Sequence, residues 1–226
     1  MLNEFTARPI FGFTLCVLAY YIGVKTKKRF DYPIVTPIVI ATLICLAVIV
    51  VFDIPLSNFQ NGASMITMFL APATAALALS IYHQLSIIKK NLIPILVGCI
   101  VGAATAVGSI LVLCKVMGLP EDITASLVPK SITTAIATEL SEKLGGIVPV
   151  TVAAVTVTGI FGTIVSPYLL KWTRLDNPIA AGLAIGASCH ALGTAKAIEI
   201  GETEGSLSGI AVGICGLATV FLTLFI

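Results

Sequence analysis

The chain has little charge, and this shortage indicates the solvent in which it folds. Lysine, arginine, aspartate and glutamate make up 11% of its 226 residues, whereas soluble domains carry about 25%. Hydrophobic residues make up 58%, and the mean hydropathy is +1.07. This composition excludes an ordinary soluble domain and predicts an all-α protein that exposes most of its outer surface to lipid.

Patterns for catalysis, metal binding and nucleic-acid binding are also missing. The formal net charge of +2 is small and scattered, which argues against a nucleic-acid partner. The six cysteines form no C-x-x-C pair, so neither a zinc site nor a disulfide framework is indicated. No G-x-S-x-G, H-E-x-x-H or P-loop pattern occurs. We therefore expect no enzyme, no metal centre and no bound cofactor.

Long apolar runs occupy the space between the few charges. They cover residues 9–24, 33–52, 62–85, 91–117, 147–170, 177–201 and 206–226. Each is about as long as a bilayer-crossing helix. A polar loop is expected over 53–61, and a further amphipathic segment over 121–143 is broken at Pro129. The pattern predicts seven or eight membrane segments in a single transmembrane domain over residues 1–226.

Basic clusters predict how these segments are oriented. Lys25–Arg29 holds four cations in five residues, and Lys89–Lys90 closes the third run. The positive-inside rule places both clusters in the cytoplasm, so the N-terminus and the 53–61 loop lie outside. Lys171–Arg174 gives another cytoplasmic edge. The segment 121–143 is then a re-entrant hairpin that enters from the outside, because a full crossing there would place Lys171–Arg174 outside the cell.

The two halves of the chain share a pattern of runs. The ranges 33–117 and 147–226 each hold a broken run between two intact ones, and the hairpin 120–143 joins them. In the predicted orientation the two ranges run in opposite directions. Inverted repeats with discontinuous helices at the midplane are typical of secondary transporters. The alternative is chance, because apolar helices resemble one another and proline is frequent in transmembrane helices.

Polar residues interrupt the apolar pattern at two main places and one weaker one. The main breaks are Pro129–Thr134 and Ser188–Lys196, and the weaker one is at Pro72. Lipid cannot satisfy a broken backbone, so such sequence is tolerated only where protein or a wet cavity covers it. The candidate substrate-binding residues are Pro72, Thr74, Lys130, Ser131, Thr133, Thr134, Ser188, His190, Gly193, Thr194 and Lys196.

The first break has the chemistry of an anion site. A helix that starts at Ser131 would direct its free amides, together with the Lys130 ammonium, at a carboxylate. Two alternatives stay open. Lys130 could snorkel to an interface, and Thr133 and Thr134 could bond back to backbone carbonyls.

Three residues are candidates for coupling a proton to the anion. His190 lies in the second break and belongs to the residue type that titrates near neutral pH. Glu139 follows the first break, and Glu199 follows the second. His190 could instead be a helix-packing histidine, and Lys196 could simply pair with Glu199 on one helix.

Four stretches resemble the motifs of one family. They are Leu70–Ala78, Val128–Ala137, Gly186–Ala197 and Glu204–Gly209, which resemble GPATVALA, PKSVTTPIA, ASHGIGTARA and EGAFSGLAMG. In this order they are similar to the LrgB/CidB family of bacterial membrane proteins, which are called antiholin-like. The chain departs from the family pattern at Ala71, Ala135, Ala191 and Lys196, where Gly, Pro, Gly and Arg are usual. Lysine in place of arginine keeps the charge but loses the bidentate fork.

The resemblance implies two different functions. One description is control of murein hydrolases and lysis with a small holin-like (LrgA/CidA-type) membrane partner. Related proteins, including a plastid member, resemble transporters of glycolate and glycerate, and bacterial relatives are linked to pyruvate. We expect a transporter of small monocarboxylates of the pyruvate, glycolate, glycerate or lactate class, working by alternating access as a homodimer in the bacterial cytoplasmic membrane. The alternative is an antiholin-like regulator of murein hydrolase activity and autolysis that acts as or on a pore.

Overall fold

Helices make up all the regular structure in the described part of the chain. The computed structural model describes residues 6–30 and 35–225. Five of the described helices are long and apolar enough to cross a membrane. They are α2 (Pro9–Arg29), α7 (Leu92–Val116), α10 (Val148–Trp172), α11 (Pro178–Ile200) and α12 (Glu202–Thr223). The chain is therefore a multi-pass helical membrane protein, while the count of seven or eight segments and the inverted repeat stay predictions.

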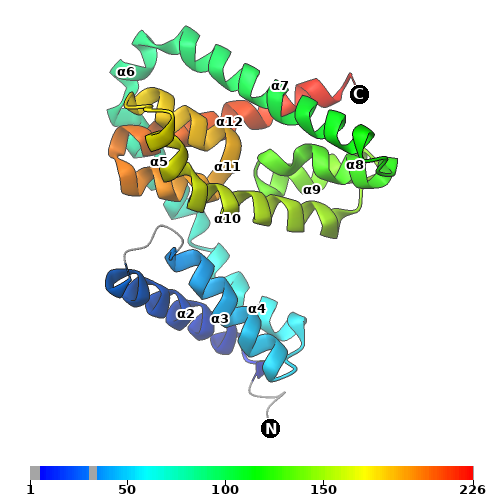
Figure 1. The fold of residues 1–226 in the computed structure, drawn as a ribbon. Coiled ribbons are helices and arrows are strands. Elements are labelled where there is room, and N and C mark those ends of the chain that lie inside the picture. The colour runs from blue at the N-terminus through cyan, green and yellow to red at the C-terminus, as the bar shows by residue number, and fades with distance from the viewer. Residues whose placement is uncertain (1–5, 31–34, 226) are drawn as a thin grey trace. The chain divides into compact units, whose positions relative to one another are not determined.

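The chain divides into two compact units, Met1–Ala76 and Leu77–Ile226. In the first unit, α2 packs against α3 (Pro37–Val51) and α4 (Leu56–Thr67) (Figure 1). Pro9 and Pro37 start their helices at a position where the missing N–H costs nothing. Gly12 and Gly62 bring α2 and α4 together, because a Cβ added at Gly12 would lie 2.6 Å from the carbonyl oxygen of Phe59.

Two boundaries in this region differ from the sequence-based expectation. The predicted polar loop over 53–61 is wrong for its second part, because α4 begins at Leu56 and includes Asn58, Gln60 and Asn61. Asn58 donates to the Thr6 hydroxyl at 3.3 Å. The predicted broken run over 62–85 belongs to two helices, α4 and α5 (Leu70–His83), but they part at Met68–Phe69 and not at Pro72. Pro72 lies in the first turn of α5, where proline is tolerated, so it does not break that helix.

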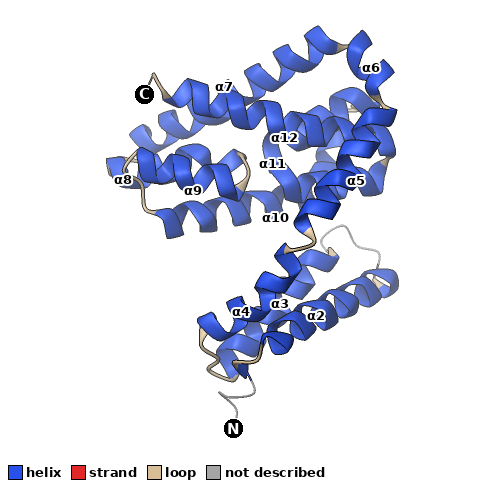
Figure 2. Cartoon of the chain, turned by 180° about the vertical axis from the view of Figure 1, so that it is seen from behind, coloured by secondary structure: helices blue, strands red, loops and turns tan. Residues whose placement is uncertain are grey.

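The second unit is built around α11 and α12, which pack along each other. α7 lies against α12, and α10 lies against α11 (Figures 1 and 2). The short α6 (Leu85–Lys90) leads into α7. A buried cluster joins α7 to α12 through Ile95, Cys99, Ala103, Leu207, Ala211 and Cys215. This packing fixes α7, α11 and α12 as one framework on which the remaining elements are placed.

The segment after α7 folds as a hairpin with a tight break. Its arms are α8 (Glu121–Leu127) and α9 (Thr134–Lys143), and the 3₁₀ turn η1 (Val128–Ser131) lies between them. At 1.5 Å per residue the arms are about 10 and 15 Å long, so neither can cross a hydrocarbon core of about 30 Å. The structure has the predicted break at Pro129 between two short helices, but the second helix starts at Thr134 and not at Ser131 as predicted, and the re-entrant placement stays a prediction. Ile132 and Thr133 are extended instead, and Ile132 is buried against Val155 of α10.

Buried hydroxyls hold the hairpin against α10. Ser126 Oγ donates to the carbonyl oxygen of Asp122 at 2.6 Å and accepts the Ile147 N–H at 2.6 Å. Thr151 Oγ1 donates to Ser141 Oγ at 2.6 Å. Ser126, Ser141 and Thr151 are all fully buried. These bonds connect both arms of the hairpin to the start of α10, so they fix where η1 lies.

We expect Ser126→Ala to destabilise the protein, because it removes the acceptor of the Ile147 N–H. Leaving such a group unpaired costs about 1–3 kcal/mol. The measurement is thermal unfolding of the purified protein in detergent. Ser109→Ala is the matched control, since that exposed hydroxyl bonds only to its own helix and its loss is expected to cost about 0.5 kcal/mol or less. Equal stability of the two variants would contradict the proposed role of Ser126.

Candidate functional site

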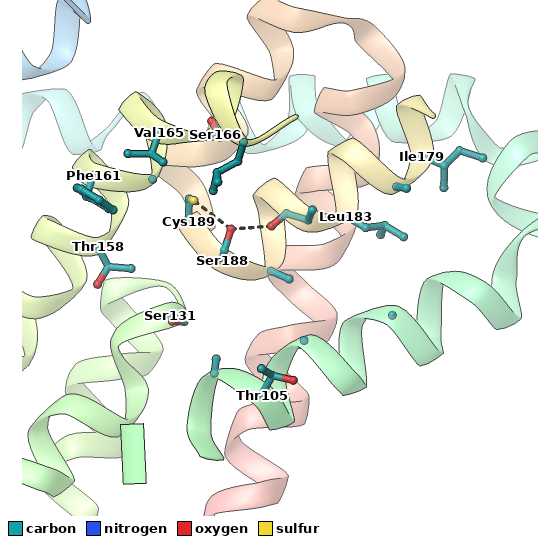
Figure 3. Close-up of a pocket in the computed structure, with 18 of the residues that line it drawn as sticks. Thr105, Ser131, Thr158, Phe161, Val165, Ser166, Ile179, Leu183, Ser188 and Cys189 are labelled. Atoms are coloured by element: carbon teal, nitrogen blue, oxygen red, sulfur yellow. Dashed lines mark hydrogen bonds between the residues drawn. The ribbon is translucent and has the colours of Figure 1, made fainter. Parts of the chain in front are cut away.

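A cavity of about 870 Å³ lies in the second unit between α7, η1, α10 and α11 (Figure 3). Most of its wall is apolar and many of its side chains are small. The polar residues of the lining are Asn91, Thr105, Lys130, Ser131, Thr158, Ser166, Asn177 and Ser188. Among the described residues of this lining, Lys130 alone carries a charge. A mostly apolar cavity with a few polar groups is the usual form of a small-molecule site.

Lys130 reaches the cavity because the chain cannot continue as a helix through Pro129. Proline has no N–H for the next helical bond, so the backbone tightens into η1 and then becomes extended at Ile132. Lys130 Nζ donates to Ser131 Oγ at 3.1 Å, and Ser131 is buried. No carboxylate in the described part of the chain pairs with Lys130. A half-buried cation without a counter-ion is costly in an apolar wall, and an anionic ligand would compensate it.

The second wall of the cavity is kinked where the sequence predicts a break. His190 has φ 44° and ψ −141° within α11, a left-handed conformation that is strained for any residue other than glycine. The kink confirms the break predicted around His190–Thr194. The His190 imidazole Nε2 lies 3.0 Å from the carbonyl oxygen of Val155 on α10, and the ring is buried. His190 therefore ties α11 to α10, while Ser188 lies on the cavity lining.

Two glycines of α10 lie against the kinked part of α11. A Cβ added at Gly159 would lie 2.6 Å from His190 Cε1. A Cβ added at Gly162 would overlap Cys189 Sγ and lie 2.8 Å from Cys189 Cβ. The close approach of α10 and α11 thus needs the absence of side chains at both positions. Figure 3 shows Cys189 and Ser188 of α11 facing the labelled α10 side chains across the space.

The structure brings three of the predicted site residues onto one cavity, namely Lys130, Ser131 and Ser188. It places the others elsewhere. Thr133 precedes α9 as its N-cap and Thr134 is exposed, and neither lines the cavity. Pro72 belongs to the first unit, and the side chain of Thr74 lies outside the described residues.

Of the remaining predicted residues, Thr194 and Lys196 have side-chain partners on α11 or α12. Thr194 Oγ1 donates to the His190 carbonyl oxygen at 3.2 Å and lies 2.9 Å from Ser208 Oγ of α12. Gly193 is buried beside it. Lys196 Nζ pairs with Glu199 at 2.8 Å, so the structure has the intrahelical pair that was the simpler interpretation. Of the other proton-coupling candidates, Glu139 is exposed on α9.

Sequence reasoning missed several residues of the site, mainly on α10. Thr158, Gly162 and Ser166 all line the cavity, and Ser166 Oγ is buried without a hydrogen-bond partner. The segment 147–170 is an uninterrupted apolar run, so no polar break marked it as part of a site. Its regularly spaced small and hydroxylated residues were the one signal available in the sequence. Within residues 6–30 and 35–225, no group of three or more His, Cys, Asp or Glu side chains could hold a metal ion.

Comparisons with known proteins point to one family. A family model described as the LrgB-like family matches residues 16–226. A Bacillus subtilis protein described as uncharacterized protein YxaC is 37% identical over 203 residues, which cover 90% of this chain and 88% of that protein. An antiholin-like protein LrgB from Bacillus mycoides is 35% identical over 216 residues, covering 95% and 94%. No solved structure matches the chain.

Proposed function

Since the chain belongs to the LrgB-like family, we propose that it is a membrane transporter of small monocarboxylates that works by alternating access. The substrate class comprises pyruvate, glycolate, glycerate and lactate. One observation carries the proposal: Lys130 and Ser131, at a helix break, line the same cavity as Ser188 beside the kink of α11. A cation and hydroxyls at the ends of discontinuous segments are what a carboxylate carrier needs.

In the proposed mechanism, η1 and the kink of α11 move relative to each other and expose the cavity to one side at a time. The inverted repeat of 33–117 and 147–226 around the hairpin 120–143 would supply the two related arrangements.

The cellular setting is part of the proposal. The protein would lie in the bacterial cytoplasmic membrane with its N-terminus outside, act as a homodimer, and use no nucleic acid or cofactor. The glycine-rich face at Gly205, Gly209 and Gly213 suits close helix contacts, either within the fold or between protomers.

The names of the relatives favour a second function. This chain matches nearly the whole length of the relatives called antiholin-like protein LrgB. That name describes a regulator of lysis better than a carrier. In this alternative the protein would control murein hydrolase activity and autolysis as or on a pore, together with a small holin-like membrane protein. A pore made by oligomerisation needs no unpaired cation at a helix break, so the environment of Lys130 favours the carrier.

Direct binding tests the carrier. We expect pyruvate, glycolate, glycerate or lactate to raise the unfolding temperature of the purified protein in a saturable way, because a ligand that binds only the folded state stabilises it. Chloride at the same ionic strength is the control for a nonspecific salt effect. Equal stabilisation by chloride and by all four acids would count against a carboxylate site.

We expect uptake to accelerate as the external pH falls, since a proton that travels with the anion gives a carrier concentrating power. His190 is the first candidate, because it forms the kink beside Ser188 and histidine is a residue type suited to carrying a proton in this pH range. His190→Gln or Glu139→Gln should flatten the profile of initial uptake rate between about pH 5.5 and about pH 8. Glu142→Gln, on the same exposed arm, is the control. Unchanged profiles in both variants would move the search to Glu199 or indicate a uniporter.

A further inference from the structure

The cavity has an apolar arm that extends away from Lys130. The arm is lined by the α7 face at Pro94, Gly98 and Gly102 and by the α11 face at Ile179, Leu183 and Ala187. Residues four apart lie on one side of a helix, so each set forms a continuous stripe. From Ala187 to Ile179 the α11 stripe is about 12 Å long at 1.5 Å per residue. Figure 3 shows Ser131 and the pair Leu183 and Ile179 on opposite sides of Ser188.

The two stripes approach each other along one edge of the arm, so a ligand chain would lie beside their line of contact. A Cβ added at Gly98 would meet only Leu183 Cδ1, at 3.9 Å, and one added at Gly102 would meet Ala187 Cβ at 3.2 Å. Small residues therefore border this edge of the arm. The cavity volume of about 870 Å³ is in the range of about 300–1,000 Å³ that takes drug-sized ligands. A two- or three-carbon acid beside Lys130 would leave the arm without a ligand.

We propose that the cavity takes monocarboxylates with an apolar tail, with the carboxylate at Lys130 and the tail in the arm that runs along α7 and α11, and that Gly98 sets the accepted tail length. This inference rests on the proposed carboxylate site and extends its substrate class. The arm itself provides no charge, and its stripes offer only hydrocarbon and glycine backbone to a ligand. Additional hydroxyls on the ligand would lose water there without gaining partners. Apolar substituents gain from leaving water.

The test is a tail-length series in the wild-type protein. Acetate, butanoate and hexanoate are titrated into protein in lipid nanodiscs, with hexanol as the uncharged match for hexanoate. Affinity is expected to rise about fourfold per methylene, the equivalent of about 0.8 kcal/mol. Hexanol is expected to bind at least about tenfold more weakly than hexanoate, because it makes no charge-assisted bond to Lys130.

Gly98→Leu is the variant that fills the arm. The longer leucine side chain would occupy cavity space beside Leu183, so the ratio of hexanoate to acetate affinity is expected to fall about tenfold or more. Gly98→Ala adds a Cβ that makes one ordinary contact, so this variant is expected to fold normally. Its ratio of hexanoate to acetate affinity should be intermediate. Gly108→Leu is the matched control, because Gly108 is on the same helix, has nothing within 4 Å of an added Cβ and does not line the cavity.

The outcomes separate this inference from the proposed function. A rising series that collapses in the Gly98 variants and survives in Gly108→Leu supports the apolar arm as the tail site. A flat series with affinity that still depends on Lys130 overturns the arm and leaves the carboxylate site standing. Hexanol binding as tightly as hexanoate overturns the arm as part of a carboxylate site. No binding of any carboxylate overturns both.

Discussion

Replacing Lys130 by alanine is expected to weaken monocarboxylate binding about 10- to 150-fold. Hydrogen bonds to charged groups contribute about 1.5–3 kcal/mol, and Lys130 is the charged residue of the described cavity lining. The measurement is titration of pyruvate and lactate into the purified protein. Lys115→Ala, which removes an exposed lysine of the same chain at the end of α7, should leave the affinity unchanged.

The stability of Lys130→Ala provides a second readout. Because Lys130 is half-buried and no described carboxylate pairs with it, its loss should not lower the unfolding temperature of the free protein. The variant should therefore fold well and bind poorly. Unchanged affinity in a well-folded Lys130→Ala protein would remove the anion site from this cavity. Lys130→Arg should keep part of the affinity, since it retains the charge in a different shape.

The second large effect is expected at Gly162. Alanine usually stabilises a helix interior relative to glycine by about 1 kcal/mol, yet Gly162→Ala should destabilise the protein by about 1–3 kcal/mol. The sign reverses because the new Cβ would overlap Cys189 Sγ at the kink of α11. Carboxylate binding should fall as well, since Ser188 adjoins Cys189 on the cavity wall. Thermal unfolding and titration of the variant check both effects.

A compensating change makes this prediction sharper. All three atoms nearest to a Cβ at Gly162 belong to Cys189, and its Cα is an ordinary 3.7 Å away. Cys189→Gly should therefore restore stability to the Gly162→Ala protein, with a coupling of about 1 kcal/mol or more in the double-mutant cycle. Gly108→Ala, where an added Cβ meets open space, should be neutral or stabilising. Additive effects of the two substitutions would show that α10 and α11 do not meet as described.

The sequence predicted the helix breaks because their causes are local. Pro129 has no N–H to continue α8, so a break there follows from the residue itself. The kink at His190 was predicted from a polar, glycine-containing stretch inside an apolar run, and the structure has it there. Pro72 shows the limit of the same reasoning, because proline in a first turn starts a helix as readily as it breaks one.

The cavity wall on α10 could not be predicted, since it depends on which helices meet. Gly159 and Gly162 are unremarkable in a transmembrane helix, and their role appears only when His190 and Cys189 are packed against them. The pairing of Lys196 with Glu199 was foreseen as an alternative, because residues three apart are neighbours on any helix. Whether Lys196 pairs with Glu199 or faces a ligand, however, depends on whether its side chain reaches the cavity, and this follows only from the packing of the helices.

Transport by the protein alone tests the central claim most directly. Labelled pyruvate, glycolate, glycerate and lactate are offered to proteoliposomes that contain only this protein, and leakage of an entrapped dye is followed in the same vesicles. The carrier account predicts saturable uptake of at least one acid, no dye leakage, and loss of that uptake in Lys130→Ala. Unselective passage of dye and acids together, unchanged in Lys130→Ala, would contradict the account and favour the pore.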